Sequence, residues 1–176
     1  MDFFDAVKER YSYRGEFEAA PVSRENLRKI LEAGLAAPSG SNIQTAYLIG
    51  IDDPALIKSI ASILGKPKAA SAPAAVCVVT HAVPAYKDTL FNIQDYSAAI
   101  ENMLLAISAL GYASCWIEGE LTEDRERQEK IAELLGVPQG HEVMAILPLG
   151  VPVKPGKRAA HLPFGERAFF NRFGET

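Results

Sequence analysis

Apolar residues recur every three or four positions in several stretches of the chain, and this spacing predicts amphipathic helices. The clearest case follows Ser23, where Leu27, Ile30 and Leu31 fall on one helical face. Ser23 is a favourable N-cap residue, and Pro38 ends the pattern. Similar spacing and end signals predict helices over residues 2–9, 23–36, 53–64, 92–110 and 122–135, the last capped by Thr122.

Short apolar runs rich in β-branched residues predict strands between these helices. They cover residues 44–51, 74–80, 113–117 and 142–149. Nearly every side chain in residues 74–80 is apolar, so we expect this strand to be buried on both faces. Residues 92–110 are apolar around most of the helical circumference, which predicts a helix in the core. The irregular alternation of helices and strands favours an α+β domain over a doubly wound one.

The end of the chain departs from this pattern. Residues 150–176 are rich in proline, glycine and basic residues, which predicts an arm instead of a packed element. Four aromatic side chains lie in it, namely Phe164, Phe169, Phe170 and Phe173. Exposed apolar side chains in such number need a surface to cover, and a partner subunit is the simplest one. We therefore expect one domain over residues 1–176, with 150–176 as an arm.

Composition narrows the classes of protein. A length of 176 residues favours a single domain. The net charge of −4 and the isoelectric point near 5.4 weigh against nucleic-acid binding. No run of 18 apolar residues predicts a membrane span, and the N-terminus does not resemble a signal peptide. Cys77 and Cys115 lie inside apolar runs and are expected to be buried and reduced, which agrees with a cytoplasmic location.

The most informative segment for chemistry is residues 10–14. In an extended conformation, Arg10, Ser12 and Arg14 share one face, while Tyr11 and Tyr13 take the other. Two guanidinium groups and a hydroxyl on one face suit a phosphate or another oxyanion. The polar segment 38–44 adds amide and hydroxyl groups that suit the edge of a heterocycle. Together the two segments predict a cofactor that carries a phosphate and a ring.

Other sources of chemistry have little support. The three histidines are scattered along the sequence without a metal-ligand spacing, so no metal site is expected. The sequence contains no Gly-x-Ser-x-Gly, no phosphate-binding Gly-x-x-x-x-Gly-Lys and no Gly-x-Gly-x-x-Gly motif. No side chain is a convincing catalytic group, and the cofactor is expected to carry the reaction.

Four motifs follow one another along the chain. They are Arg-x-Ser-x-Arg at residues 10–14, Ala-Pro-Ser-x-x-Asn-x-Gln at 37–44, Leu-Gly at 110–111 with Cys-Trp-Ile-Glu-Gly at 115–119, and Gly-x-Pro at 150–152 with Lys154, Lys157 and Arg158 downstream. In this order, and over essentially the whole chain, they resemble the nitroreductase family of FMN-dependent oxidoreductases. The resemblance implies a three-layer α+β fold with a central mixed, mostly antiparallel sheet flanked by helices.

The resemblance also implies a domain-swapped homodimer with FMN at the interface and the C-terminal arm on the partner. NADH or NADPH would reduce FMN, which would then reduce a small-molecule acceptor in a ping-pong cycle. The acceptor stays open among a nitroaromatic, a quinone, free flavin and an enone. A non-catalytic flavin store or sensor is the main alternative, followed by reductive dehalogenation or flavin fragmentation.

For the phosphate of FMN, the resemblance implies Arg10, Ser12 and one of Lys157 and Arg158, and it implies Arg14 at the pyrimidine edge of the ring. The other reading of the arginines is a pair of surface cations in weak salt bridges. The remaining residues that the resemblance implies at the cofactor are Tyr11, Lys68, the main chain of Glu118 and Gly119, and Ser39, Asn42 and Gln44 from the partner. Lys68 is equally well explained as a solvated lysine in a turn.

The segment over residues 81–95 is short compared with that of larger members of the family. We therefore expect an open pocket, with Tyr86, Phe91 and Tyr96 as candidate residues at its rim. An open pocket leaves the class of acceptor undetermined.

Overall fold

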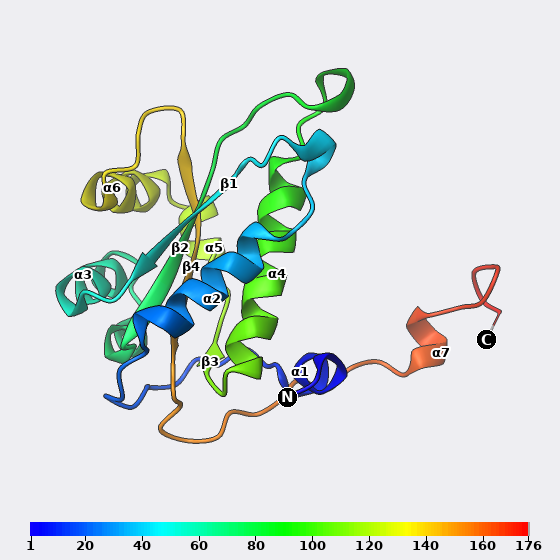
Figure 1. The fold of residues 1–176 in the computed structure, drawn as a ribbon, viewed down its shortest axis with the longest axis horizontal. Coiled ribbons are helices and arrows are strands. Elements are labelled where there is room, and N and C mark those ends of the chain that lie inside the picture. The colour runs from blue at the N-terminus through cyan, green and yellow to red at the C-terminus, as the bar shows by residue number, and fades with distance from the viewer. Residues whose placement is uncertain (176) are drawn as a thin grey trace.

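The computed structural model describes residues 1–175, and its centre is a four-stranded sheet (Figure 1). The strands are β1 (Ala46–Ile51), β2 (Ala74–Thr80), β3 (Ala113–Ser114) and β4 (Glu142–Gly150), in the order β1-β2-β4-β3. All neighbouring strands pair antiparallel. An isolated parallel bridge joins Ser12 to Ser114 at the β3 edge. The α+β fold with a mostly antiparallel sheet, expected from the sequence, is confirmed.

Helices cover both faces of the sheet. Their bounds are α1 (Phe3–Glu9), α2 (Arg24–Leu35), α3 (Pro54–Ile63), α4 (Asn92–Ala109), α5 (Gly119–Thr122), α6 (Arg125–Leu135) and α7 (Phe164–Arg167). Figure 1 shows α3 and α6 on one side of the sheet and α2 and α4 on the other. Short 3-10 helices are η1 (Gly40–Asn42), η2 (Pro67–Ser71) and η3 (Tyr86–Asp88). The structure therefore has the three layers that were expected.

Strand β2 explains why the layers form. All seven of its residues are buried, as predicted. Ala75, Cys77 and Val79 pack into the cluster that includes α3 and α6, whereas the alternate residues Val76 and Val78 pack into the cluster of α2 and α4. Because successive side chains of a strand point to opposite faces, an all-apolar strand needs cover on both sides.

Local signals set most helix boundaries. The Ser23 hydroxyl accepts a hydrogen bond from the Asn26 N–H at 3.1 Å, and Asp53 caps α3 in the same way through the Ala55 N–H at 2.7 Å. Gly136 ends α6 in a left-handed conformation with φ of 67°. These caps confirm the predicted starts of α2 and α3 and the end of α6.

The predicted start of the helix over 122–135 is wrong. The chain forms the short helix α5 first, and α6 begins only at Arg125. The cap of α6 is Asp124, whose carboxylate accepts from the Arg127 N–H. The Thr122 hydroxyl instead donates to the Gly119 carbonyl at 3.2 Å. A hydroxyl that bonds back into the preceding turn does not cap the next helix.

The predicted strand over 113–117 is also too long, since β3 contains two residues. Ile117 still bridges to Ile146, in the register that pairs Ser114 with Leu149. That register places Cys115 opposite Pro148. Proline has no N–H, so the ladder loses a hydrogen bond at this point and the strand is interrupted.

The C-terminal segment runs away from the body of the molecule (Figure 1). Phe164 and Phe170 are each 63% exposed, and Phe173 is 94% exposed. Their ring contacts are with one another: the Phe164 and Phe170 centroids are 6.0 Å apart, and those of Phe169 and Phe173 are 4.6 Å apart. The aromatic side chains therefore remain available to a further surface. Among residues 1–175, no helix is long and apolar enough to cross a membrane.

Candidate functional site

A pocket of about 380 Å³ opens at the end of the molecule where β3 lies. Its walls come from residues 13–15, 17, 66–69 and 115–120, with Pro148 of β4. We call it the Arg14 pocket. Three segments that are distant in the sequence meet there, and each contains a residue predicted at the cofactor, namely Arg14, Lys68 and the Glu118–Gly119 pair.

Strand pairing holds the first wall in place. The Tyr13 N–H donates to the Ser114 carbonyl at 2.8 Å, beside the parallel bridge of Ser12. Tyr13 is buried, and its hydroxyl donates to the Glu16 carbonyl at 2.5 Å. Residues 12 and 13 therefore run as an extended segment beside β3, which is the condition under which the two faces of residues 10–14 were assigned. Its alternation turns Arg14 outward into the pocket and Tyr13 into the core.

Three cations line the pocket, namely Arg14, Lys66 and Lys68. Lys66 forms an ion pair with Glu120, another residue of the pocket wall. Within the described range 1–175, Arg14 and Lys68 form no ion pair. The pocket thus holds two cations whose charge is available to an anionic group. Sequence reasoning missed Lys66, although it flanks Pro67 as Lys68 does.

The Glu118 side chain is fixed by two donors. The Tyr96 hydroxyl donates to Oε1 at 2.8 Å, and the Trp116 indole N–H donates to Oε2 at 2.7 Å. Burial, together with the neighbouring Glu118 carboxylate, raises the pKa of Tyr96. Both carboxylate oxygens are therefore engaged inside the protein. The next residue, Gly119, is surrounded by open space, because a Cβ built on it meets no atom within 4 Å.

Cys115 also lies in the pocket wall. Burial raises the pKa of its thiol, while Arg14 and Lys66 act in the opposite direction. Burial alone raises the pKa of Cys77, in the sheet, to about 12. Both cysteines are buried and free, as predicted. A thiol that stays protonated near neutral pH is a weak nucleophile, so Cys115 contributes to the wall.

The residues predicted at a phosphate lie outside the Arg14 pocket, around the end of α1. The Arg10 Nε atom is 3.5 Å from Glu101 Oε1. Arg158 pairs with Glu9, the last residue of α1, so the tail returns to this segment. Tyr11 contributes too, because its hydroxyl accepts from the Gly156 N–H at 3.4 Å, and a Cβ on Gly156 would clash with the Tyr11 ring.

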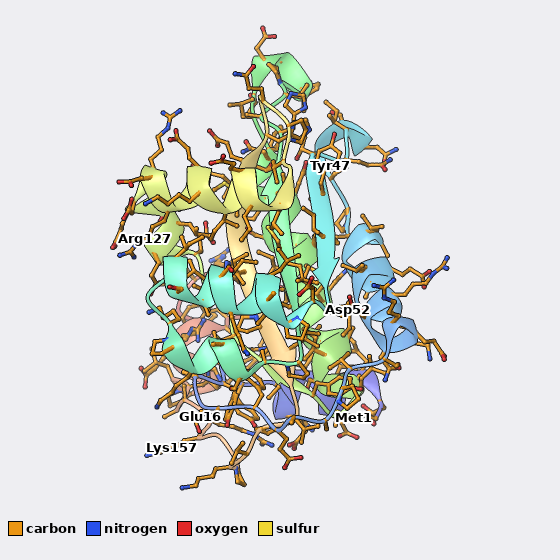
Figure 2. All side chains as sticks on the ribbon, turned by 90° about the vertical axis from the view of Figure 1, so that its left-hand side faces the viewer. Met1, Glu16, Tyr47, Asp52, Arg127 and Lys157 are labelled. Carbon is orange, nitrogen blue, oxygen red and sulfur yellow. The ribbon has the colours of Figure 1, made fainter. Side chains whose placement is uncertain are left out.

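Ser12 and Lys157 are both exposed. Figure 2 shows Lys157 at the same end of the molecule as Glu16 and far from Tyr47. The structure therefore brings the predicted phosphate residues to one end of the molecule. Residues 10–14 connect them directly to the Arg14 pocket.

The loop over residues 39–44 lies elsewhere. Ser39 and Gln44 line a second pocket of about 270 Å³, which shares no residue with the Arg14 pocket. Ser41, Asn42 and Gln44 have positive φ values of 50°, 56° and 59°. The Gln44 N–H donates to the Ser39 hydroxyl at 3.0 Å, and the Gln44 amide donates to Asn42 Oδ1 at 3.3 Å. Within one chain, the loop does not join the residues around Arg14.

The three residues predicted at the rim of the pocket have different surroundings. Tyr86 is 60% exposed. Phe91 packs on the loop, since a Cβ on Gly40 would lie 2.7 Å from the Phe91 Cβ. Tyr96 is only 2% exposed, so its assignment to the rim is wrong. It lies on the face of α4 that turns into the core.

The histidines are less scattered than the sequence suggested. Thr80 pairs with Glu142 across β2 and β4, and the residues just beyond, His81 and His141, therefore stack with centroids 4.6 Å apart. Tyr47 adds an edge contact to His141 at 4.9 Å. Within residues 1–175, no group of three or more His, Cys, Asp or Glu side chains has a geometry for a metal ion.

Comparisons with known proteins all point to nitroreductases and related flavoproteins. The model of the nitroreductase family matches residues 7–75 and 64–151. A proposed NADH dehydrogenase/NAD(P)H nitroreductase of Archaeoglobus fulgidus is 34% identical over 133 residues, which are 74% of this chain and 75% of the relative.

Two solved structures have a similar fold. A proposed NADH dehydrogenase/NAD(P)H nitroreductase of Bacteroides thetaiotaomicron has a TM-score of 0.83 at 23% identity, covering 97% of this chain and 98% of the other. A BluB-like flavoprotein of Clostridium difficile has a TM-score of 0.83 at 25% identity, covering 98% and 100%.

Proposed function

The chain belongs to the nitroreductase family of oxidoreductases, and from this premise we propose that it is an FMN-dependent enzyme. It would take a hydride from NADH or NADPH and pass it to a small-molecule acceptor by a ping-pong cycle. The observation that carries the proposal is the Arg14 pocket, which is lined by Gly119 and by two cations without an ion-pair partner in residues 1–175.

The residues of the pocket fit a flavin. When bound, FMN supplies a ring that takes up a hydride and passes it on. Negative charge at the pyrimidine edge of such a ring would be stabilised by Arg14 and Lys68. Lys66 is partly neutralised by Glu120 and would act more weakly. The absence of a side chain at Gly119 lets a planar group approach the main chain of Glu118 and Gly119.

Arg10, Ser12 and the Lys157–Arg158 pair would bind the phosphate. Arg10 and Arg158 are engaged with Glu101 and Glu9. Partly exposed ion pairs of this kind contribute little, typically about 0–1 kcal/mol. A phosphate dianion, which accepts several charge-assisted hydrogen bonds, would therefore displace the carboxylates.

A second copy of the chain would complete the site. Ser39, Asn42 and Gln44 lie apart from the Arg14 pocket and would reach the FMN of a partner subunit. Exposed apolar side chains support such an assembly at both ends of the chain, with Phe3 and Phe4 on α1 and Phe164, Phe170 and Phe173 in the tail. In this proposal, residues 150–176 form an arm on the partner of a single-domain subunit.

The second candidate is a flavin-binding protein without turnover. One structural relative is called a flavoprotein, and its name states no activity. Both candidates predict bound FMN, and they differ in whether a nicotinamide reduces it.

The test begins with the purified protein and added FMN. We expect a bound flavin whose visible band is bleached by NADH or NADPH without oxygen and restored by a nitroaromatic, a quinone or free flavin. Lys68→Gln should slow the bleaching, whereas Lys58→Gln, on α3 outside the pocket, should not. A protein that binds no FMN would refute both candidates. Bound FMN that neither nicotinamide reduces would leave the second.

A further inference from the structure

Two adjacent residues near the start of α4 contact the two polar segments that the proposed function uses. Asp95 bonds to the 39–44 loop, and Tyr96 bonds to Glu118. We propose that Asp95 and Tyr96 are positioning residues, the first for Ser39, Asn42 and Gln44 and the second for Glu118 and Gly119. The inference rests on the proposed function, because those segments are assigned to the cofactor there.

Asp95 holds the loop at both of its ends. Its Oδ1 accepts from the Gly40 N–H at 2.8 Å, and its Oδ2 accepts from the Thr45 hydroxyl at 2.6 Å. Asp95 is 4% exposed and Thr45 is 3% exposed, so water does not replace these bonds. A carboxyl group in the first turn of a helix often bonds to the start of its own helix. Here both oxygens reach a segment about 50 residues away in the sequence.

The loop needs such an anchor. Three non-glycine residues in it, Ser41, Asn42 and Gln44, have positive φ, a conformation that side chains other than glycine rarely adopt. Conformations of this kind persist only when surrounding contacts over-determine them. The contacts inside the loop, from Gln44 to Ser39 and Asn42, are exposed. The bond from Thr45 to Asp95 is buried and the bond from Gly40 is partly buried, so both are better shielded from water than the contacts inside the loop.

Tyr96 acts on the other segment. Its hydroxyl is one of two donors that hold the Glu118 carboxylate, and the second comes from Trp116, two residues before Glu118. Tyr96 belongs to a rigid 18-residue helix, whereas Trp116 belongs to the segment that it bonds. Tyr96 therefore connects the Glu118 side chain to α4. The main chain before Gly119 is already held by the bridge between Ile117 and Ile146, and the Tyr96 bond adds a contact between the Glu118 side chain and α4.

Because the two residues are neighbours on one helix, a single rigid element sets both segments. In the homodimer of the proposed function, the loop serves the FMN of the partner and Gly119 serves that of its own subunit. The start of each α4 then contacts the walls of two cofactor sites.

The test uses the full chain and variants of single contacts. Asp95→Asn retains one acceptor oxygen, Asp95→Ala retains none, and Thr45→Val removes only the hydroxyl. Tyr96→Phe removes one hydroxyl bond. Tyr112→Phe is its matched control, since it removes a tyrosine hydroxyl whose partner, Asn26 on α2, belongs to neither segment. Amide hydrogen exchange is measured without FMN, followed by FMN affinity and the midpoint potential of the bound flavin.

We expect Asp95→Asn and Thr45→Val to speed exchange over residues 39–45 and to weaken FMN binding about tenfold, as for a lost buried hydrogen bond. Asp95→Ala should do more, so that Asn partly rescues it. The midpoint potential should stay that of the wild type. Tyr96→Phe should instead speed exchange over residues 117–120 and shift the potential, with FMN affinity changed less than about twofold.

Unchanged exchange over residues 39–45 in Asp95→Asn and Thr45→Val would overturn the assignment of Asp95. If Tyr96→Phe behaves as Tyr112→Phe in exchange and potential, the assignment of Tyr96 is wrong. If Asp95→Ala does not fold, Thr45→Val still decides. A wild-type chain that binds no FMN would refute the proposed function alone, because the exchange measurements need no flavin.

Discussion

The Arg14 pocket and the 39–44 loop contain the same kinds of polar residue but are built in different ways. The pocket is assembled within one chain from three segments that β3, η2 and α5 bring together. The loop is held by bonds from Gly40 and Thr45 to Asp95, and it lines a different pocket. The difference suggests that each chain contributes to two cofactor sites. Its Arg14 pocket would form part of its own site, and its 39–44 loop would form part of the site of the partner. The predictions below test that division.

The largest effect is expected from removing residues 159–176. This deletion retains Lys157 and Arg158 but removes the exposed phenylalanines of the tail. We expect loss of the dimer and a fall in FMN affinity of roughly 100-fold or more, because the loop of the partner is lost with several polar contacts. Light scattering and FMN titration measure both. Deleting residues 174–176, which contain no aromatic residue, is the control; an intact dimer in the longer deletion would contradict the division.

Arg10→Ala and Arg14→Ala should separate binding from reduction. Loss of a charge-assisted bond to phosphate should weaken FMN binding by about 10- to 100-fold in Arg10→Ala. Arg14→Ala should mainly lower the rate of flavin reduction, by about tenfold, because it removes charge beside the ring. FMN titration and stopped-flow reduction by NADH or NADPH provide the two readouts. Equal effects of both variants on both properties would remove the distinction between phosphate and ring.

Gly119→Ala tests whether the open space in the pocket is used. A Cβ there meets no protein atom within 4 Å, so the free energy of unfolding should change by less than about 1 kcal/mol. FMN affinity should fall a few-fold, because the methyl group takes space beside the ring. Gly34→Ala is the opposite control, since its Cβ would lie 2.7 Å from Leu48 and should reduce stability first. Unchanged FMN binding in Gly119→Ala would place the ring elsewhere.

The effect that is smallest near neutral pH concerns the two thiols, because it appears only at high pH. Burial raises the pKa of Cys77 from 9.0 to about 12, so the folded state keeps its proton where the unfolded state loses it. This contribution to stability is complete below pH 9.0 and is lost as the pH rises toward 12, at up to about 1.4 kcal/mol per pH unit. Urea unfolding at several pH values, with Cys77→Ala as the comparison, measures it.

Bound FMN should slow alkylation of Cys115, in the pocket wall, and leave alkylation of Cys77 unaffected. If FMN protects Cys77 and not Cys115, Cys115 does not lie beside the cofactor.

Much of the fold was predictable because its signals are local. Ser23 and Asp53 cap helices through their own side chains, and the apolar run of β2 needs cover on both faces wherever it lies. For residues 10–14, alternation assigned the side chains to two faces on the condition that the segment is extended, and the pairing of Ser12 and Tyr13 with Ser114 meets this condition. The family could be proposed from the motifs because their order along the chain is read from the sequence and requires no knowledge of contacts.

The wrong predictions have two causes, namely distant partners and competition between neighbouring cap residues. Pro148 interrupts β3 from a strand more than 30 residues away, and Thr122 lost its capping role to Asp124 through a bond to the preceding turn. Tyr96 was placed at the rim because it follows the short segment over residues 81–95, yet it is buried and its partner Glu118 lies 22 residues further along the chain. Pro148 and Glu118 are distant along the chain and cannot be recognised from nearby spacing, whereas Thr122 and Asp124 are neighbouring residues that are both favourable caps.

The sequence by itself determined the helices with strong caps, the doubly covered strand and the motifs of the nitroreductase family. Only the tertiary structure decided that Arg14, Lys66 and Lys68 share one pocket, that His81 stacks on His141, and that the 39–44 loop lies apart. The physical reason is range. Capping and alternation act over a few residues, whereas a pocket depends on which distant backbone segments pair and pack, and that is set by the sheet as a whole.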